Sequence, residues 1–204
     1  TICPYVWVPV KPASKQKALT IDEFLRLLDA CAGVPHLRLF VIIAITTGAR
    51  SEAIVGLLWE QVDFKVGTID LRSREVVNPL TKKVRKGRSI VPMTAEARAA
   101  LQEAAAGALT DNVIEWDGSP VKKVRKAFQA AVERAGLKGV TPHTLRHTLA
   151  SWLDEDGIPM ERISKLLGHR NVDITRTIYA KPSVETLRPA ADVIDLRIRR
   201  NAVQ

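Results

Sequence analysis

Two histidines and an arginine lie close together in the segment Thr141–Leu153, whose sequence is TPHTLRHTLASWL. His143 and Arg146 are three positions apart, so they project from the same side of a helix. Thr141 is a favourable N-cap and Pro142 a favourable first residue, which places this pair in the first turns. We expect both side chains on an open side of the helix, where a phosphate can bind.

Side chains of the same kinds occur in two other segments. Arg50 follows an apolar run and a glycine in TTGARSEAIVGLLW, whereas His169 follows LLG and Tyr179 lies ten positions further on. Phosphodiester transfer builds charge on non-bridging oxygens, to which two guanidiniums can each donate two parallel hydrogen bonds. A tyrosine hydroxyl, with a pKa of about 10, is a plausible nucleophile, and a histidine can accept its proton. Together these residues predict phosphoryl transfer without a metal.

Each residue also has an ordinary structural explanation, such as an exposed histidine, a surface salt bridge or a core aromatic. A zinc site is a further alternative, because His143 and His147 are four positions apart. However, the acidic base that metalloprotease helices place between such histidines is absent, and no cluster of Cys, Asp or Glu supplies a third ligand. The sequence therefore predicts no metal.

The elements that must position these residues are predicted to be mainly helical. Thr20 and Glu23 form a capping box before a helix. The predicted buried stripe of that helix comprises Ile21, Phe24, Leu25 and Leu28. The run 37–47 is apolar nearly all round, which predicts a buried helix that Gly48 ends. Further helices are predicted in SPVKKVRKAFQAAVERAG and at about 142–156, 159–168 and 172–179.

The middle of the chain has a different character. The segments GTIDL and RSIVPM are rich in β-branched residues, with the basic stretch TKKVRKG between them. The predicted fold is therefore mainly α with a small three-stranded antiparallel β-sheet. We predict a linker or arm over residues 1–18, a catalytic domain over 19–182 and a tail helix over 183–204.

Composition indicates the class of partner. The chain has 31 Lys+Arg and 22 Asp+Glu residues, a formal charge of +9, which favours a polyanion such as nucleic acid. Aromatic residues make up only 5%, so stacking on single strands is disfavoured and duplex DNA is expected. The predicted DNA contacts are Arg72, Arg74, Arg85 and Arg88 around the hairpin and Lys122, Lys123, Arg125 and Lys126 at the start of a basic helix. The apolar run at 37–47 is too short to span a bilayer, and no disulfide framework is indicated.

The motifs TGARSEAIVGLLW, HTLRHTLAS, LLGH and TIYAK, in that order, resemble the catalytic domain of the tyrosine recombinase (phage integrase) family over roughly residues 19–185. The resemblance implies site-specific DNA recombination and integration, as in a phage or mobile element, through a 3′-phosphotyrosyl intermediate. It also implies that no metal or nucleotide cofactor is needed. The implied fold is a mostly helical domain with a small antiparallel sheet, shared with type IB topoisomerases.

The resemblance assigns roles residue by residue. The catalytic set that it implies is Arg50, His143, Arg146, His169 and Tyr179, with Tyr179 as the nucleophile. The supporting set is Glu52, which orients Arg50, and His147, which packs. A hairpin lysine before Val91-Pro92 completes the set: the TKK context favours Lys83, with Lys82 and Lys86 as alternatives. The spacing from His169 to Tyr179 is one residue longer than the commonest family spacing.

The resemblance also implies partners. It implies self-association to a tetramer on duplex DNA, although the isolated domain can be monomeric. The apolar tail packs either on its own domain or on a neighbouring protomer. We expect the protein in the cytoplasm of a bacterial or phage-infected cell, associated with the nucleoid and not with a membrane. Two alternatives stay open, a type IB topoisomerase and a DNA-binding protein that has lost catalysis.

Overall fold

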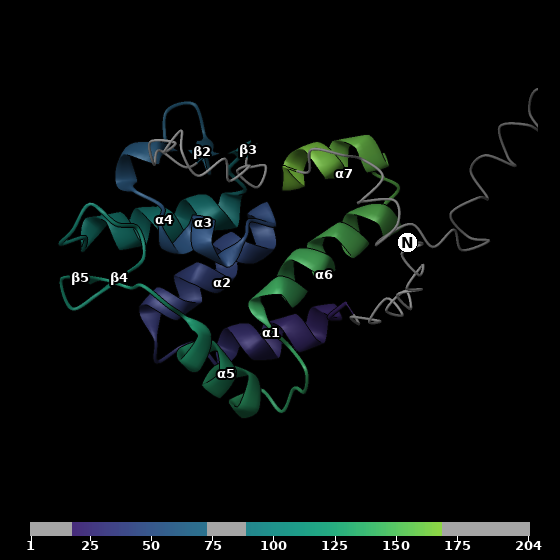
Figure 1. The fold of residues 1–204 in the computed structure, drawn as a ribbon, viewed down its shortest axis with the longest axis horizontal. Coiled ribbons are helices and arrows are strands. Elements are labelled where there is room, and N and C mark those ends of the chain that lie inside the picture. The colour runs from purple at the N-terminus through teal and green to yellow at the C-terminus, as the bar shows by residue number, and fades with distance from the viewer. Residues whose placement is uncertain (1–17, 73–88, 169–204) are drawn as a thin grey trace, which may run out of the picture.

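The computed structural model describes residues 18–72 and 89–168, and these form a mainly helical domain (Figure 1). The helices are α1 (Ile21–Asp29), α2 (Pro35–Thr47), α3 (Ser51–Val55), α4 (Ala95–Ala106), α5 (Arg125–Arg134), α6 (Pro142–Glu155) and α7 (Met160–Leu167), with one 3-10 turn, η1 (Trp59–Gln61). The strands are β1 (Val62–Asp63), β2 (Thr68–Asp70), β3 (Ile90–Pro92), β4 (Glu115–Trp116) and β5 (Ser119–Pro120). The predicted linker at 1–18, apart from Ala18, the helix at 172–179 and the tail at 183–204 lie outside the described residues.

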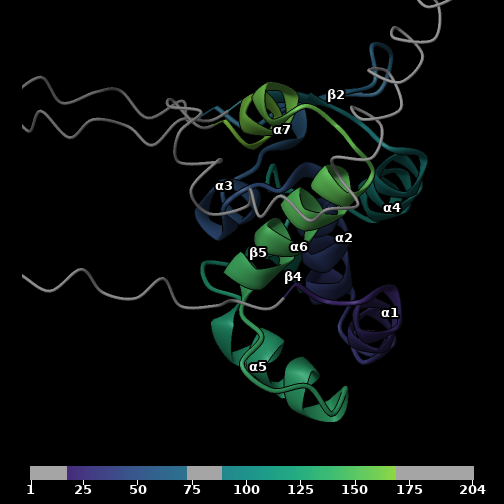
Figure 2. The ribbon, with the colours of Figure 1, turned by 90° about the vertical axis from the view of Figure 1, so that its right-hand side faces the viewer.

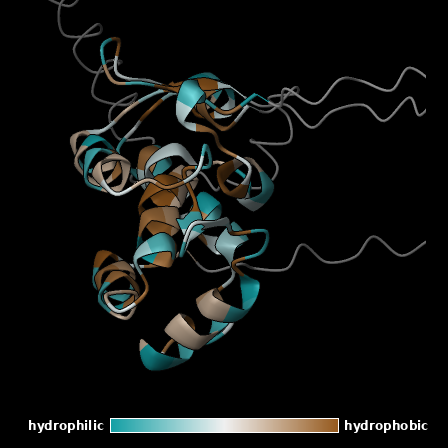
Figure 3. Ribbon diagram, turned by 90° about the vertical axis from the view of Figure 1, so that its left-hand side faces the viewer, coloured by the Kyte–Doolittle hydropathy of each residue, from teal (hydrophilic) through white to brown (hydrophobic). Residues whose placement is uncertain are grey.

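Helix α2 forms the centre of the domain. It runs between α1, α4 and α6, and its apolar residues stand out in the hydropathy view (Figures 2 and 3). Eight of its residues are buried, including Phe40 and Ile43, because its sequence is apolar nearly all round. Gly48 ends the helix with φ of 61°, as predicted from its place after the apolar run. This end of α2 lies at the candidate site.

Helix α1 confirms one prediction and corrects another. The capping box is present, since the N–H of Glu23 donates to Thr20 Oγ1 at 3.2 Å and the N–H of Thr20 to the Glu23 carboxylate at 2.9 Å. The predicted stripe is partly wrong: Ile21 and Leu25 are 55% and 48% exposed, while Leu27 is fully buried. The helical period fits either face, and packing against α2 and α5 selects the face that carries Leu27.

The predicted three-stranded antiparallel sheet is confirmed, with strand order β1-β2-β3. Ile69 pairs with Val91 in the register, and both side chains are buried. The amide of Leu71 continues the pairing by donating to the carbonyl of Ser89 at 3.1 Å. The sheet therefore fixes Ser89 at the edge of the candidate site.

A second sheet, of strands β4 and β5, was not predicted. Asp117 and Gly118 join these strands with φ of 49° and 67°, and Asp-Gly is a strong signal for such a hairpin. The predicted helix at 119–136 is consequently too long, because Ser119 and Pro120 belong to β5 and α5 begins at Arg125. Lys122 and Lys123 therefore precede the helix instead of forming its first turn, although both are exposed.

Helices α6 and α7 occupy the predicted places. Thr141 is the N-cap of α6 and Pro142 its first residue. The middle of α6 is tied to the start of α1, because Leu19 N donates to Thr148 Oγ1 at 3.0 Å and Trp152 Nε1 donates to the carbonyl of Leu19 at 3.0 Å. Within residues 18–72 and 89–168, no helix is long and apolar enough to cross a membrane.

Candidate active site

Arg146 joins three helices at one end of the domain. Its Nη1 donates to the carbonyl of Gly48 at 2.6 Å, and its Nη2 donates to the carbonyl of Leu167 at 2.9 Å. Gly48 is the C-cap of α2 and Leu167 the last residue of α7, so the guanidinium lies between two helix C-termini. The partial negative charge of both termini stabilises the cation there. The side chain is thereby held in one position.

The prediction that Arg146 lies on an open side of α6 is wrong. The residue is only 2% exposed, whereas His143, one turn earlier, is exposed. Burying a guanidinium is costly unless hydrogen bonds and opposite charge offset the loss of hydration. The two carbonyls supply that offset, and they come from positions that are 98 and 21 residues away in the chain.

Arg50 shares one cavity with His143 and another with Arg146. Its backbone caps α3, since its carbonyl accepts hydrogen bonds from Ala53 N at 2.8 Å and Ile54 N at 3.2 Å. Its side chain lines an open cavity of about 190 Å³ together with Glu52 and His143. It also lines a narrow crevice with Arg146, with Ser89 just before β3 and with the last residues of α7. The structure therefore brings three of the predicted catalytic side chains into adjoining cavities.

The positive charges near His143 affect its pKa. Although part of the residue is exposed, burial of its imidazole is the largest cause that lowers the pKa below the ordinary value. The positive charges of Arg146, His147 and Arg50 lower the pKa further. The imidazole is therefore neutral near pH 7, a form that can accept a proton or a hydrogen bond.

The supporting residues take different positions. His147 is half-buried on α6, and Glu52 is exposed at the cavity beside Arg50. Arg72 is exposed and forms a bidentate pair with Asp70, with nitrogen–oxygen distances of 2.9 and 2.7 Å. Such an exposed pair contributes little to stability. Arg72 thus has a carboxylate partner two residues earlier in the chain, at the end of β2, which sequence reasoning did not anticipate.

Several predicted site residues lie outside the described part of the chain. These are the candidate lysines Lys82, Lys83 and Lys86, the hairpin arginines Arg74, Arg85 and Arg88, and the pair His169 and Tyr179. His169 directly follows Gly168, which ends α7 with φ of 64°. The described chain thus reaches the residue that precedes His169.

Sequence reasoning missed two participants of the site. Gly48 was predicted only as a helix end, yet its carbonyl is an acceptor for Arg146. Ser89 was not predicted at all, yet its Oγ donates to the carbonyl of Leu166 at 2.8 Å and it lines the crevice with Arg50 and Arg146. A glycine two positions before Arg50 is a visible signal, whereas nothing in the sequence distinguishes Ser89.

The family model described as the phage integrase family matches residues 17–186. The chain belongs to this family. The matched range includes all of the described domain and every predicted catalytic residue, so the integrase-family resemblance is confirmed at the level of the whole domain.

Individual relatives agree with the family assignment. An integrase of Streptomyces ambofaciens is 28% identical over 212 residues, covering 91% of this chain and 54% of the relative. The tyrosine recombinase XerA of Thermococcus kodakarensis is 32% identical over 193 residues, covering 90% of this chain and 64% of the relative. The integrase-family chain therefore spans about half to two thirds of the length of these curated relatives.

A solved structure confirms the predicted fold class. The Tn1549 transposon integrase, in complex with circular intermediate DNA, matches with a TM-score of 0.73 at 21% identity. The match covers 91% of this chain and 68% of that one. The mainly helical domain with a small antiparallel sheet is therefore the family's fold.

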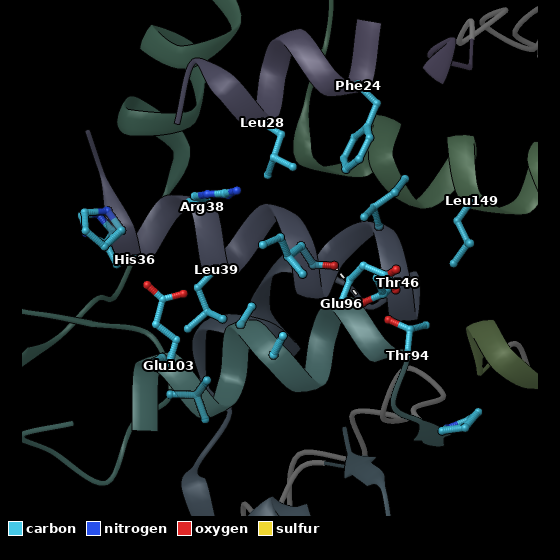
Figure 4. Close-up of a pocket in the computed structure, with 18 of the residues that line it drawn as sticks. Phe24, Leu28, His36, Arg38, Leu39, Thr46, Thr94, Glu96, Glu103 and Leu149 are labelled. Carbon is cyan, nitrogen blue, oxygen red and sulfur yellow. Dashed lines mark hydrogen bonds between the residues drawn. The ribbon is translucent and has the colours of Figure 1, made fainter. Parts of the chain in front are cut away.

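A larger groove of the integrase-family domain lies beside the central helix (Figure 4). It encloses about 950 Å³ and runs along α2 between α1, α4 and α6, with Phe24 and Leu149 among its apolar lining residues. Its polar residues include the carboxylates Glu96, Glu103 and Glu115. None of its lining residues belongs to the cavity of Arg50 and His143. An apolar groove with carboxylates does not suit a phosphate, so this groove is not a candidate phosphate site.

Proposed function

We propose that this chain is the catalytic domain of a site-specific DNA recombinase that cleaves and rejoins duplex DNA through a 3′-phosphotyrosyl intermediate. One observation supports this most strongly: Arg146, buried and held between two helix C-termini, shares a crevice with Arg50, which shares a cavity with His143. Two guanidiniums and an imidazole in this arrangement suit a phosphodiester whose oxygens gain charge during transfer. The DNA-bound Tn1549 integrase is a relative in fold that supports duplex DNA as the substrate.

The proposed reaction uses these residues in one displacement. Arg50 and Arg146 donate hydrogen bonds to the non-bridging oxygens, and His143 accepts a hydrogen bond or proton at the site. The Tyr179 oxygen attacks phosphorus, a bond between them forms, and the bond to the 5′ oxygen breaks. The phenolic proton passes to a base, and Lys83 protonates the departing 5′ oxygen. A 5′ hydroxyl of a second strand reverses these steps and completes the exchange.

Three further assignments complete the proposal. His169 follows the last turn of α7, where Arg146 binds, and is proposed to contact the same phosphate. Lys83 is proposed as the general acid because its TKK context resembles the family pattern, with Lys82 and Lys86 as alternatives. Glu52 is proposed to orient Arg50, with which it shares a cavity.

Replacement of Tyr179 by phenylalanine tests the proposed function. The parent chain is incubated with a random-sequence library of nicked duplexes, and covalent adducts are isolated on a denaturing gel and their DNA is sequenced. We expect the parent to form an adduct and Tyr179→Phe to form none while binding the selected duplex as tightly as the parent, because only the nucleophilic oxygen is lost. Tyr5→Phe is the matched control and keeps the adduct. An adduct that persists in Tyr179→Phe would exclude this residue as the nucleophile.

The same assay separates the proposed recombinase from its alternatives. A recombinase transfers the cleaved strand to the 5′ hydroxyl of a second duplex, whereas a topoisomerase only religates the original strand. A protein that has lost catalysis forms no adduct. The proposal includes assembly to a tetramer on DNA within the host cell's cytoplasm, as the family resemblance implies.

Salt dependence tests the proposed DNA contacts. We expect the affinity for a duplex to fall steeply with salt, with a log–log slope of about −0.9 for each neutralised phosphate. The double substitution Lys122→Gln and Lys123→Gln removes two exposed cations before α5 and should reduce that slope by about 1 to 2. Arg26→Gln, at an exposed position of α1, is the matched control and should leave the slope unchanged. Filter binding at several salt concentrations measures the slope. If the affinity of the parent for the duplex did not change with salt, the proposed contacts would be contradicted.

A further inference from the structure

The last turn of α7 is held on the site from two sides. The carbonyl of Leu167 accepts the hydrogen bond from Arg146 Nη2 at 2.9 Å, and the carbonyl of Leu166 accepts one from Ser89 Oγ at 2.8 Å. Carbonyls in the last turn of a helix have no α-helical partner, so side chains from elsewhere, water or a tightened last turn satisfy them. Arg146 belongs to α6 and Ser89 to the segment that leads into β3. The end of α7 therefore bridges the helical body and the sheet.

Ser89 is itself rigidly placed. Its carbonyl accepts the amide of Leu71 at 3.1 Å, which extends the pairing of β2 with β3. It is half-buried and lines the crevice that Arg50 and Arg146 also line. A hydroxyl on a sheet can therefore fix the position of the adjacent helix end.

We propose that Ser89 is a positioning residue for the phosphate site, acting on Arg146 through the end of α7. Its hydroxyl anchors the carbonyl of Leu166, and the neighbouring carbonyl of Leu167 is the acceptor that orients the guanidinium of Arg146. Without the hydroxyl, the last turn of α7 can move, and the acceptor of Nη2 moves with it. Ser89 does not touch the reacting phosphate in this scheme. The inference rests on the proposed function, because it assigns Arg146 a role in catalysis.

Ser89→Ala and Ser89→Thr test this role in the complete chain. With the duplex selected above at saturating concentration, Ser89→Ala should form the adduct about tenfold more slowly than the parent, the order of effect expected from one lost hydrogen bond. Its affinity for the duplex should stay the same. Ser89→Thr keeps a hydroxyl and should restore most of the rate. Thr94→Ala is the matched control, since it removes the N-cap hydroxyl of α4, which accepts Ala97 N at 3.1 Å, and should cleave at the parental rate while folded.

Hydrogen exchange of the duplex-free protein supplies a readout that needs no catalysis. In Ser89→Ala, amides of the segment 160–168 should exchange at least severalfold faster than in the parent, and in Thr94→Ala they should not. An unchanged exchange rate in this segment overturns the proposal, even if the parent forms no adduct and the proposed function fails. A parental cleavage rate in Ser89→Ala, or a loss of rate equal to that of Thr94→Ala, overturns it as well.

Discussion

Replacement of Arg146 by lysine is expected to slow cleavage strongly and to destabilise the domain. One ammonium group cannot donate at the same time to the carbonyls of Gly48 and Leu167 with the geometry of the guanidinium fork. At least one buried carbonyl then loses its partner, which lowers the free energy of unfolding by about 1–3 kcal/mol. The loss of one aligned donor to the phosphate is expected to slow the reaction by about 10²–10³-fold.

Two measurements check the expected result for Arg146→Lys. Urea denaturation gives the free energy of unfolding, and the rate of adduct formation on the selected duplex gives the activity. Arg162→Lys is the matched control, because Arg162 is exposed on α7, and it should behave like the parent in both measurements. If Arg146→Lys were as stable and as active as the parent, the buried contacts of Arg146 would not hold the site together.

Replacement of Gly48 by alanine is expected to have the second large effect. Gly48 has φ of 61°, a conformation that costs an ordinary residue about 1–2 kcal/mol. A Cβ atom at this position would overlap Leu167 Cδ2 and would approach Leu149 Cδ2 to 3.0 Å. Overpacking of this kind costs about 1–3 kcal/mol, so we expect a total loss of about 2–5 kcal/mol in the free energy of unfolding. Cleavage should also slow, because the carbonyl that orients Arg146 shifts with the residue.

A matched glycine provides the control for this prediction. Gly107 follows α4 with φ of −113°, and no atom lies within 4 Å of a Cβ placed there. Gly107→Ala should therefore leave stability nearly unchanged. A double-mutant cycle with Leu167→Ala separates the two causes, since removal of the clashing side chain relieves the overlap but not the backbone strain. If Gly48→Ala and Gly107→Ala had equal stabilities, neither cause would operate at Gly48.

Much of the fold could be predicted because its signals are local. The capping box of Thr20 and Glu23, the stop at Gly48 and the start of α6 at Thr141 each depend on residues a few positions apart. The sheet was predicted from β-branched segments for the same reason. The hairpin at Asp117-Gly118 has an equally local signal, which the prediction did not use. The predicted helix therefore began too early and wrongly included Lys122 and Lys123, whereas α5 begins at Arg125.

Other features could not be predicted because distant packing decides them. The face of α1 was misjudged, since its period allowed either Leu25 or Leu27 inward and only the contacts with other helices favour Leu27. His143 and Arg146 project from the same side of α6, yet His143 is exposed and Arg146 is buried. The sequence carries no sign of this difference.

The family, the helical architecture and the residue types of a phosphate site follow from the amino-acid sequence alone, because motif order and helix signals are properties of short segments. The burial of Arg146, and the contacts by which Gly48, Ser89 and the end of α7 surround it, depend on how the chain packs. The physical reason is that the acceptors of Arg146 are backbone carbonyls, which every residue carries, and that folding alone brings the C-termini of α2 and α7 to one guanidinium.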